Sequence, residues 1–186
     1  MLLGMKRIPE ENSKRTLHME WSRDNQYNGF NSYKGLTYFE NYKKILDWIN
    51  GKGSLPPPVE CNLDPIAACN VNCYFCITQR YLHNPREIGD MKVLPTDYML
   101  RLITFLEDWG VRGLCVSGGG EPTLHAGFTA ILNRCAATMK MKTSTFTNAL
   151  AISDEVASAL LTCQFVAIAI QTNNAGTYKN IMGVDG

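Results

Sequence analysis

The feature that most constrains this chain is a run of three cysteines, Cys69, Cys73 and Cys76. Their spacing of i, i+4 and i+7 can bring three thiolates round one point if the backbone wraps as an open loop. Three thiolates suit a soft metal centre such as an iron–sulfur cluster. An ordinary cluster takes four cysteines, and no fourth follows in this run. One iron would therefore keep an open position, as catalytic metal sites do, which predicts a cluster that takes part in chemistry.

A zinc site is the alternative interpretation of the same cysteines. Structural zinc usually takes a fourth Cys or His from a second pair of ligands. The nearest candidate, His83, has no CxxC or HxxxH partner. The spacing therefore favours iron and sulfide over zinc.

Composition limits the classes of protein to which the chain can belong. Its 186 residues are 45% hydrophobic, enough for one packed domain. The formal net charge of +1 is spread along the chain without a basic stripe, which argues against nucleic acid as a partner. The longest apolar run, 165–170, is too short to cross a bilayer. Seven cysteines, several of them in apolar runs, predict reduced thiols and a cytoplasmic location.

Hydrophobic periodicity predicts helices that alternate with short strands. We expect a helix at 37–50, a first strand at 59–67 limited by Pro65, and then helices at 95–110, 128–139 and 153–161 that alternate with strands at 114–116, 142–147 and 165–170. The last strand is apolar at every position, as a strand covered on both faces would be. This alternation predicts an α/β fold with a parallel sheet. A strand that leads directly into the cysteine loop suits an α/β barrel, whose sites lie beyond the carboxyl ends of the strands.

A second motif, the run from Gly118 to Pro122 with the sequence GGGEP, follows the strand expected at 114–116. Glycines at that position let a ligand approach the backbone closely. The carboxylate of Glu121 can pair with an ammonium group. Taken alone, such a run is also typical of an ordinary turn.

The two motifs together resemble those of the radical S-adenosylmethionine (radical SAM) enzymes. The cysteine run is similar to their CxxxCxφC signature, in which φ is aromatic and is Phe75 here. The glycine run resembles their GGEP motif, and it lies one strand after the cysteine loop, as in that family. The resemblance covers roughly residues 59–183, with less specific matches at Thr147-Asn148 and at 178–183.

The resemblance implies a set of ligands for a cluster and a cofactor. Three cysteines would hold a 4Fe–4S cluster, and the fourth iron would take the amino and carboxylate groups of S-adenosylmethionine. The implied metal ligands are Cys69, Cys73 and Cys76, and the implied cofactor contacts are Phe75 near the adenine, Gly118, Gly119, Gly120 and Glu121 at the amino group, and Asn148 and Gln171.

Two positions depart from the family pattern. Ala149 stands where many members have the glycine of a Thr-Asn-Gly run. Gln171-Thr172-Asn173 stands where many members have Ser and Asp. Gln171 and Asn173 can still hydrogen-bond the cofactor carboxylate or a substrate, and a plain surface loop is the alternative.

The resemblance also implies a reductive reaction. An external one-electron donor of the flavodoxin or ferredoxin type would reduce the cluster. The cofactor would then be cleaved to a 5′-deoxyadenosyl radical that abstracts hydrogen from an unidentified substrate, and no side chain beyond the cluster and cofactor is assigned to catalysis. Two other interpretations stay open. One is a non-catalytic iron–sulfur electron carrier, and the other is an inactive or regulatory fragment.

The expected organisation is an irregular arm and one helix at 1–55, followed by a radical SAM core at 56–186. The family barrel usually has six βα units, whereas about four are expected here, so the fold class is α/β with a partial parallel (βα) barrel. We interpret the chain as a fragment of a longer protein, with completion by another chain as the alternative.

Overall fold

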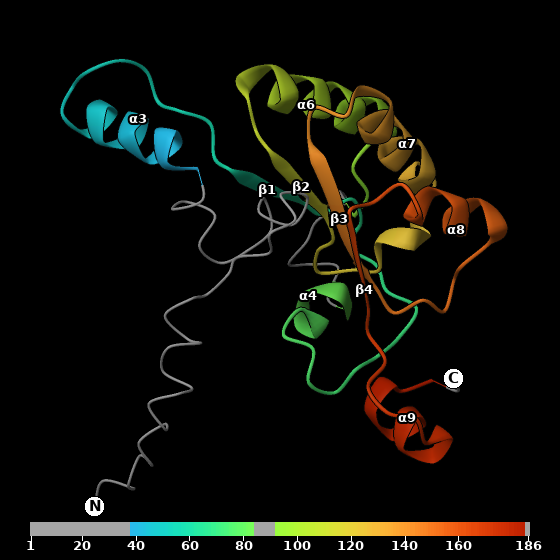
Figure 1. The fold of residues 1–186 in the computed structure, drawn as a ribbon. Helices are drawn as coiled ribbons and strands as arrows, with labels where there is room; N and C mark the ends of the chain where they lie inside the picture. The colour runs from blue at the N-terminus through green and yellow to red at the C-terminus, as the bar shows by residue number, and fades with distance from the viewer. Residues whose placement is uncertain (1–37, 84–91, 185–186) are drawn as a thin grey trace, which may run out of the picture.

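The computed structural model describes residues 38–83 and 92–184 (Figure 1). The irregular arm expected before residue 37 lies outside these residues. The α/β architecture predicted from periodicity is confirmed, because strands and helices alternate through the described chain.

Four parallel strands form one sheet in the order β1-β2-β3-β4. Their bounds are Glu60–Leu63, Gly113–Val116, Lys142–Thr147 and Phe165–Ile168. Each strand pairs with the next one along the chain. The carboxyl ends of all four strands therefore meet at one edge of the sheet.

The first strand is shorter than predicted. Its ladder ends at Leu63, and Pro65, which has no amide proton, follows two residues later. The chain stays ordered beyond the strand, because Leu94 N donates to Pro65 O at 2.9 Å and Ile66 forms an isolated antiparallel bridge with Val93. The cysteine loop thus starts from a fixed base rather than from a longer strand.

Three helices cover one face of the sheet: α6 (Thr96–Trp109), α7 (Phe128–Thr138) and α8 (Asp154–Leu160) (Figure 1). Gly110 ends α6 in the left-handed conformation, and Ser153 caps α8 by accepting from Val156 N. The core lies between these helices and the sheet and includes Met99, Ile103, Leu114, Val116, Phe128, Ile131 and Leu132.

Shorter elements lie at the carboxyl edge of the strands. They are α4 (Gln79–His83), the 3-10 turn η2 (Pro122–Leu124) and α9 (Ala175–Met182). Figure 1 shows α4 and α9 together below this edge, at the end of the sheet where the cysteine loop runs. The remaining helix, α3 (Phe39–Ile49), lies on the amino-terminal side of β1.

The last strand is an exposed edge in the described part of the chain. Its apolar run is typical of a strand covered on both faces, yet Phe165 is 40% exposed and Ile168 is 54% exposed. Met139, the left-handed residue that ends α7, is exposed as well. The strand β4 is the outer strand of the described sheet, so one face and one edge of it have no neighbour there.

Helix α3 has the predicted bounds within two residues, but its apolar side chains are exposed in the described structure. None of the helices in the described ranges has the length and hydrophobicity that a bilayer crossing needs.

Candidate cluster and cofactor site

A cleft of about 650 Å³ opens at the carboxyl edge of the sheet. It lies between the cysteine loop after β1, the glycine loop after β2, and the segments that follow β3 and β4. All but one of the site residues predicted from the sequence line this cleft: Cys69, Cys73, Phe75, Cys76, Gly118, Gly119, Gly120, Glu121, Asn148 and Gln171. The exception is Asn173, which lines a neighbouring hollow after β4 instead. Residues from four separate chain segments therefore face one space.

The end of α9 supports the cysteine loop from below. The amide of Asn72 donates to Met182 O at 2.8 Å, and the amide of Tyr74 donates to Ile181 O at 3.2 Å. These carbonyls belong to the last turn of a helix, where carbonyls lack partners within the helix. The sulfur atoms of Cys73 and Met182 lie 3.4 Å apart. The fourth βα unit thus fixes the backbone that carries the middle cysteine.

The three thiols of the loop influence one another electrostatically. Partial burial raises the pKa of Cys69; the amide of Val71 opposes this rise, and the charges of Glu121 and Cys76 add to it. Burial also raises the pKa of Cys73, and the charges of Cys69 and Cys76 add to that rise. Such mutual effects need short separations between the sulfur atoms. A bound cation would reverse this effect by stabilising the thiolates.

Within residues 38–83 and 92–184, no group of three His, Cys, Asp or Glu side chains is arranged to hold a single metal ion. A polynuclear cluster binds each cysteine through a different iron atom, so its ligands stand farther apart than those of one ion. Three thiols that face one cleft fit that kind of group.

The glycine loop packs directly on the start of the cysteine loop. Glu121 N donates to Ala68 O at 2.8 Å. A Cβ atom at Gly120 would lie 2.3 Å from Ile66 O and 2.4 Å from Ala68 O, which no side chain can occupy. Gly118 has a φ of +131°, and a Cβ there would lie 2.4 Å from the carboxyl carbon of Asp64. Glycine is therefore required at both positions by local packing alone.

The Glu121 side chain is almost fully buried and satisfied within the protein. Its Oε1 accepts from Thr147 Oγ1 at 2.6 Å, from Thr123 Oγ1 at 2.7 Å and from Thr123 N at 3.2 Å. Its Oε2 accepts from Asn148 N at 2.8 Å. This carboxylate joins the glycine loop to the end of β3. These hydrogen bonds give Glu121 a structural role in addition to the cofactor contact that the motif implies.

Asn148 connects a third segment to the cysteine loop. Its Nδ2 donates to Asn70 Oδ1 at 2.7 Å and lies 3.9 Å from Cys69 Sγ. The next residue, Ala149, has a φ of +61°, which is the left-handed conformation that favours glycine. Ala149, in place of the family's glycine, thus keeps the left-handed backbone of the turn, at the cost of some strain.

Phe75 and Gln171 lie on the outer walls of the cleft. Phe75 is half exposed and stacks edge-on with Tyr74, with 5.5 Å between the ring centroids. Gln171 is exposed and follows β4.

Thr78 is a functional candidate that sequence reasoning missed. Its Oγ1 donates to Gly119 O at 2.8 Å and lies 3.0 Å from Cys76 Sγ. The hydroxyl therefore links the last cysteine of one motif to the glycine loop of the other. The only signal in the sequence was its place two residues after Cys76. Asp64, which also lines the cleft, carried no motif signal, and Met182 lay in the less specific match at 178–183.

Comparison with known proteins identifies the family. The family model of the radical SAM superfamily matches residues 63–186, about two thirds of the chain. The chain belongs to the radical SAM superfamily. The resemblance drawn from the cysteine and glycine motifs is thereby confirmed.

Several relatives of this radical SAM chain are longer proteins. UPF0026 protein slr1464 from Synechocystis sp. (strain ATCC 27184 / PCC 6803 / Kazusa) is 32% identical over 117 residues, which are 61% of this chain and 40% of that protein. The structure of Streptococcus suis SuiB bound to the precursor peptide SuiA matches with a TM-score of 0.60 at 24% identity, over 94% of this chain and 38% of that one. BtrN in complex with AdoMet and 2-DOIA gives a TM-score of 0.44 at 13% identity, over 67% and 52% of the two chains.

The likeness to SuiB confirms that the described sheet is the radical SAM type of partial barrel. The chain spans about two fifths of the length of SuiB and of the Synechocystis protein.

Proposed function

We propose that this chain binds a 4Fe–4S cluster through Cys69, Cys73 and Cys76 and binds S-adenosylmethionine in the adjoining cleft, as a radical SAM enzyme or as part of one. The observation that carries the proposal is the convergence of two motifs, about 45 residues apart in the sequence, on one cleft of about 650 Å³. Membership of the superfamily supports the choice of cluster and cofactor.

The main chain of the glycine loop offers the contacts for the cofactor's amino group. Carbonyls at Gly118, Gly119 and Gly120 carry no side chain in front of them, and an ammonium group donates well to carbonyl oxygens. The nearby Glu121 carboxylate adds negative charge behind the loop. Phe75 presents its apolar ring to the adenine, while Asn148 and Gln171 offer amide groups to the cofactor carboxylate or to the substrate.

When bound, the cluster and the cofactor would supply the chemistry: one-electron reductive cleavage of a carbon–sulfur bond of the cofactor, which releases methionine and provides the means to take hydrogen from a substrate. The protein's own task is to hold the reacting groups in register and to limit contact with water. The groups are held in register by hydrogen bonds from Thr78 to Gly119 and from the end of β3 to Glu121.

Electrons would come from an external donor of the flavodoxin or ferredoxin type. The surface beside the cysteine loop suits the docking of such a protein, because Tyr74 is 72% exposed and Ile77 is 92% exposed on either side of Cys76. Exposed aromatic and aliphatic side chains of this kind are typical of protein interfaces.

The test is anaerobic reconstitution of the chain with iron and sulfide. Replacing Cys69, Cys73 or Cys76 with Ala should abolish the broad visible absorption of the cluster. Cys61→Ala and Cys163→Ala, which change thiols outside the cleft, should leave that absorption intact. Addition of S-adenosylmethionine should then change the EPR spectrum of the reduced cluster. A cluster that bleaches in Cys163→Ala but survives in Cys73→Ala would overturn the assignment.

Cofactor cleavage separates an enzyme from an electron carrier. An enzyme should release 5′-deoxyadenosine when it is reduced with dithionite in the presence of S-adenosylmethionine. A carrier would be reduced and reoxidised with the cofactor intact.

A further inference from the structure

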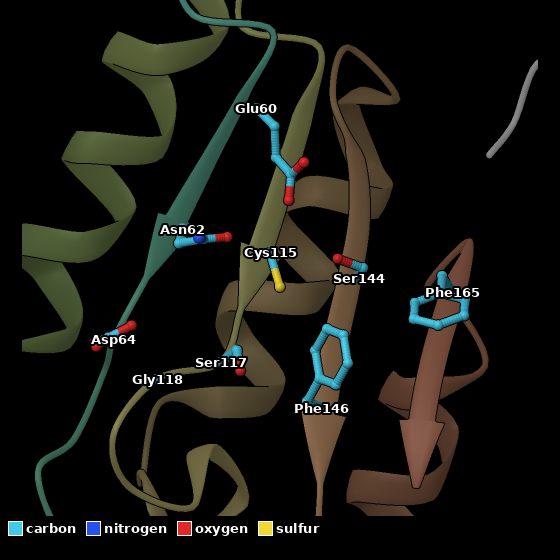
Figure 2. A pocket seen from close by; sticks show the side chains of 9 residues that line it. All are labelled: Glu60, Asn62, Asp64, Cys115, Ser117, Gly118, Ser144, Phe146 and Phe165. Carbon is cyan, nitrogen blue, oxygen red and sulfur yellow. The ribbon is translucent and has the colours of Figure 1, made fainter. Parts of the chain in front are cut away.

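A second cavity, of about 390 Å³, lies on the open face of the sheet, opposite the three covering helices (Figure 2). Its walls are side chains that point away from the core at alternate positions of the strands. They are Glu60, Asn62 and Asp64 from β1 and its end, Cys115, Ser117 and Gly118 from β2 and its end, Ser144 and Phe146 from β3, and Phe165 from β4.

This cavity is acidic on the β1 side. Glu60 and Asp64 contribute two carboxylates to its wall, and no Lys, Arg or His is among the 9 residues that line it. Asp64 forms no side-chain hydrogen bond or ion pair with any other residue in the described ranges, and it is exposed to the cavity. The local charge therefore favours a cation.

Ser144 provides an independent sign that the cavity takes a polar ligand. Its side chain is only 1% exposed, yet its hydroxyl has no hydrogen-bond partner in the part of the chain that the structure describes. Buried hydroxyl groups are nearly always paired, because an unpaired one loses the hydrogen bonds that water would otherwise give it. Figure 2 shows this hydroxyl above the sheet face, turned towards Cys115 on the neighbouring strand. A ligand in the cavity would supply the missing partner.

The β3 and β4 side of the same cavity is apolar. The rings of Phe146 and Phe165 meet edge to face, with 5.8 Å between their centroids, and are 49% and 40% exposed. Aromatic faces of this kind pack against hydrocarbon chains and rings and also attract cations. The cavity therefore pairs an acidic wall with an aromatic wall across the width of the sheet.

The cavity adjoins the cofactor cleft. Asp64, Ser117, Gly118 and Phe146 line both spaces. A molecule held on the sheet face would thus lie next to the glycine loop, within reach of a cofactor held there.

We propose that this cavity binds the substrate of the site through a protonated amine, held by Asp64 and its polar neighbours, with the adjacent apolar part of the substrate packed on Phe146 and Phe165. The identification of the ligand as the substrate rests on the function proposed above, whereas the amine-binding site itself does not. The chemical class is a primary ammonium attached to an apolar chain or ring, as in a free amine or in a lysine side chain beside an aromatic residue.

The experiment uses the chain without its cluster and measures binding by saturation-transfer NMR. Phenethylamine is the probe, and 3-phenylpropionate, of similar size and opposite charge, is the matched control ligand. We expect phenethylamine to bind and phenylpropionate to bind at least fivefold more weakly. Asp64→Asn should lower the affinity for phenethylamine at least fivefold, and Ser144→Ala should lower it by a smaller factor. Asp108→Asn, which alters an exposed carboxylate on α6 away from the cavity, should not change it.

A dipeptide amide, N-acetyl-Lys-Phe-NH2, distinguishes the two sources of the amine. Tighter binding of this peptide than of phenethylamine would indicate a peptide substrate, and weaker binding a small molecule. Equal binding of phenethylamine and phenylpropionate, or an affinity for phenethylamine that Asp64→Asn leaves unchanged, would overturn the proposal. Because no cluster is needed, a failure here is separate from a failure to assemble the cluster.

Discussion

The hydroxyl of Thr78 donates a 2.8 Å hydrogen bond to the carbonyl of Gly119, which is 41 residues away in the chain. The same oxygen lies 3.0 Å from the sulfur of Cys76. Because a threonine hydroxyl has one proton, and Gly119 O takes it, the thiol of Cys76 is the donor in the second contact. One side chain therefore sets the spacing between the cysteine loop and the glycine loop.

Thr78→Val should loosen this link without changing the volume of the side chain. We expect a loss of about 1 kcal/mol in the free energy of unfolding, the usual net value of one hydrogen bond. We also expect weaker binding of S-adenosylmethionine to the reconstituted chain. Urea denaturation of the cluster-free chain measures the change in stability. Titration with S-adenosylmethionine, followed by the EPR spectrum of the reduced cluster, measures the change in cofactor affinity.

Two variants serve as controls for Thr78. Thr78→Ser keeps the hydroxyl and should retain most of the cofactor affinity. Thr129→Val makes the same chemical change on the exposed surface of α7, where the hydroxyl bonds Glu155, and should have little effect on either quantity. Cofactor affinity that is equal in Thr78→Val and Thr78→Ser would show that the hydroxyl does not position the glycine loop.

Glu121 should matter for stability before any cofactor is bound. Its 3% exposed carboxylate accepts from Thr147, Thr123 and the amide of Asn148. Glu121→Ala leaves these donors buried and unpaired, so we expect a loss of about 2–4 kcal/mol in unfolding free energy. Glu121→Gln should cost less: its carbonyl oxygen can keep the bond from the Asn148 amide, and its NH2 group can donate to the threonine hydroxyls once these turn, so that only the 3.2 Å bond from Thr123 N is lost.

The matched control for Glu121 is Glu155→Ala. Glu155 is exposed at the start of α8 and accepts from Thr129, so its loss should cost well under 1 kcal/mol. Chemical denaturation of the cluster-free proteins gives both values. If Glu121→Ala were as stable as Glu155→Ala, the network around Glu121 would have no structural role.

The sequence predicted the strands and the two motifs well because these features depend on local pattern. Lys142–Thr147 is a β-branched run, and the observed strand β3 has the same bounds. The cysteine and glycine motifs were placed at the ends of neighbouring parallel strands, which by geometry bring them to one edge. The contacts of Thr78 and Glu121 with partners 41 and 26 residues away have no local signature, so they could not be predicted from the sequence.

The exposure of the last strand has a related explanation. An apolar run indicates that a strand is covered but does not say which segment covers it. In the described chain, β4 has only β3 beside it, and Ile168 and Ile170 are 54% and 74% exposed. The polar face of β1 and β2 was also missed, because its alternation is visible only once the sheet is assembled and its open side is known.

Gly120→Ala should disrupt the packing of the glycine loop on the cysteine loop. The added Cβ would lie 2.3 Å from Ile66 O and 2.8 Å from Ala68 N, so the backbone of the cysteine loop would have to move. We expect destabilisation of about 3 kcal/mol or more, typical of severe overpacking, together with loss of cofactor binding. Circular dichroism melts and cofactor titration measure the two effects.

Gly176→Ala, in the first turn of α9, is the matched control for Gly120→Ala. The added Cβ would lie 3.5 Å from Asn174 Oδ1, an ordinary contact distance, and alanine has a higher helix propensity than glycine. This variant should be neutral or slightly more stable than the parent. A Gly120→Ala protein with the same melting temperature as Gly176→Ala would contradict the close packing of the two loops.

Cys135 should make the stability of the chain depend on pH in alkali. It is fully buried in the core, and burial, together with the charge of Glu107, raises the pKa of its thiol to about 12 from an ordinary value of 9.0. Well below pH 9 the thiol is protonated in both the folded and the unfolded state, so its contribution to stability is constant. Between pH 9 and 12 the unfolded chain loses this proton first, which stabilises the unfolded state. The free energy of unfolding should fall there by about 1.4 kcal/mol per pH unit because of this thiol.

Urea denaturation at pH 8, 9, 10 and 10.5 tests this dependence. Cys135→Ala should lower stability at every pH through its cavity, and it should reduce the alkaline slope by about 1.4 kcal/mol per pH unit relative to the parent. Ile131→Val, which removes one buried methyl group from the same helix, should lower stability and leave the slope unchanged. The slope shared by all three proteins reports the other titrating groups, including Cys163, whose thiol pKa burial also raises to about 12. Parallel curves for Cys135→Ala and Ile131→Val would mean that the Cys135 thiol ionises in the folded core as readily as in the unfolded chain.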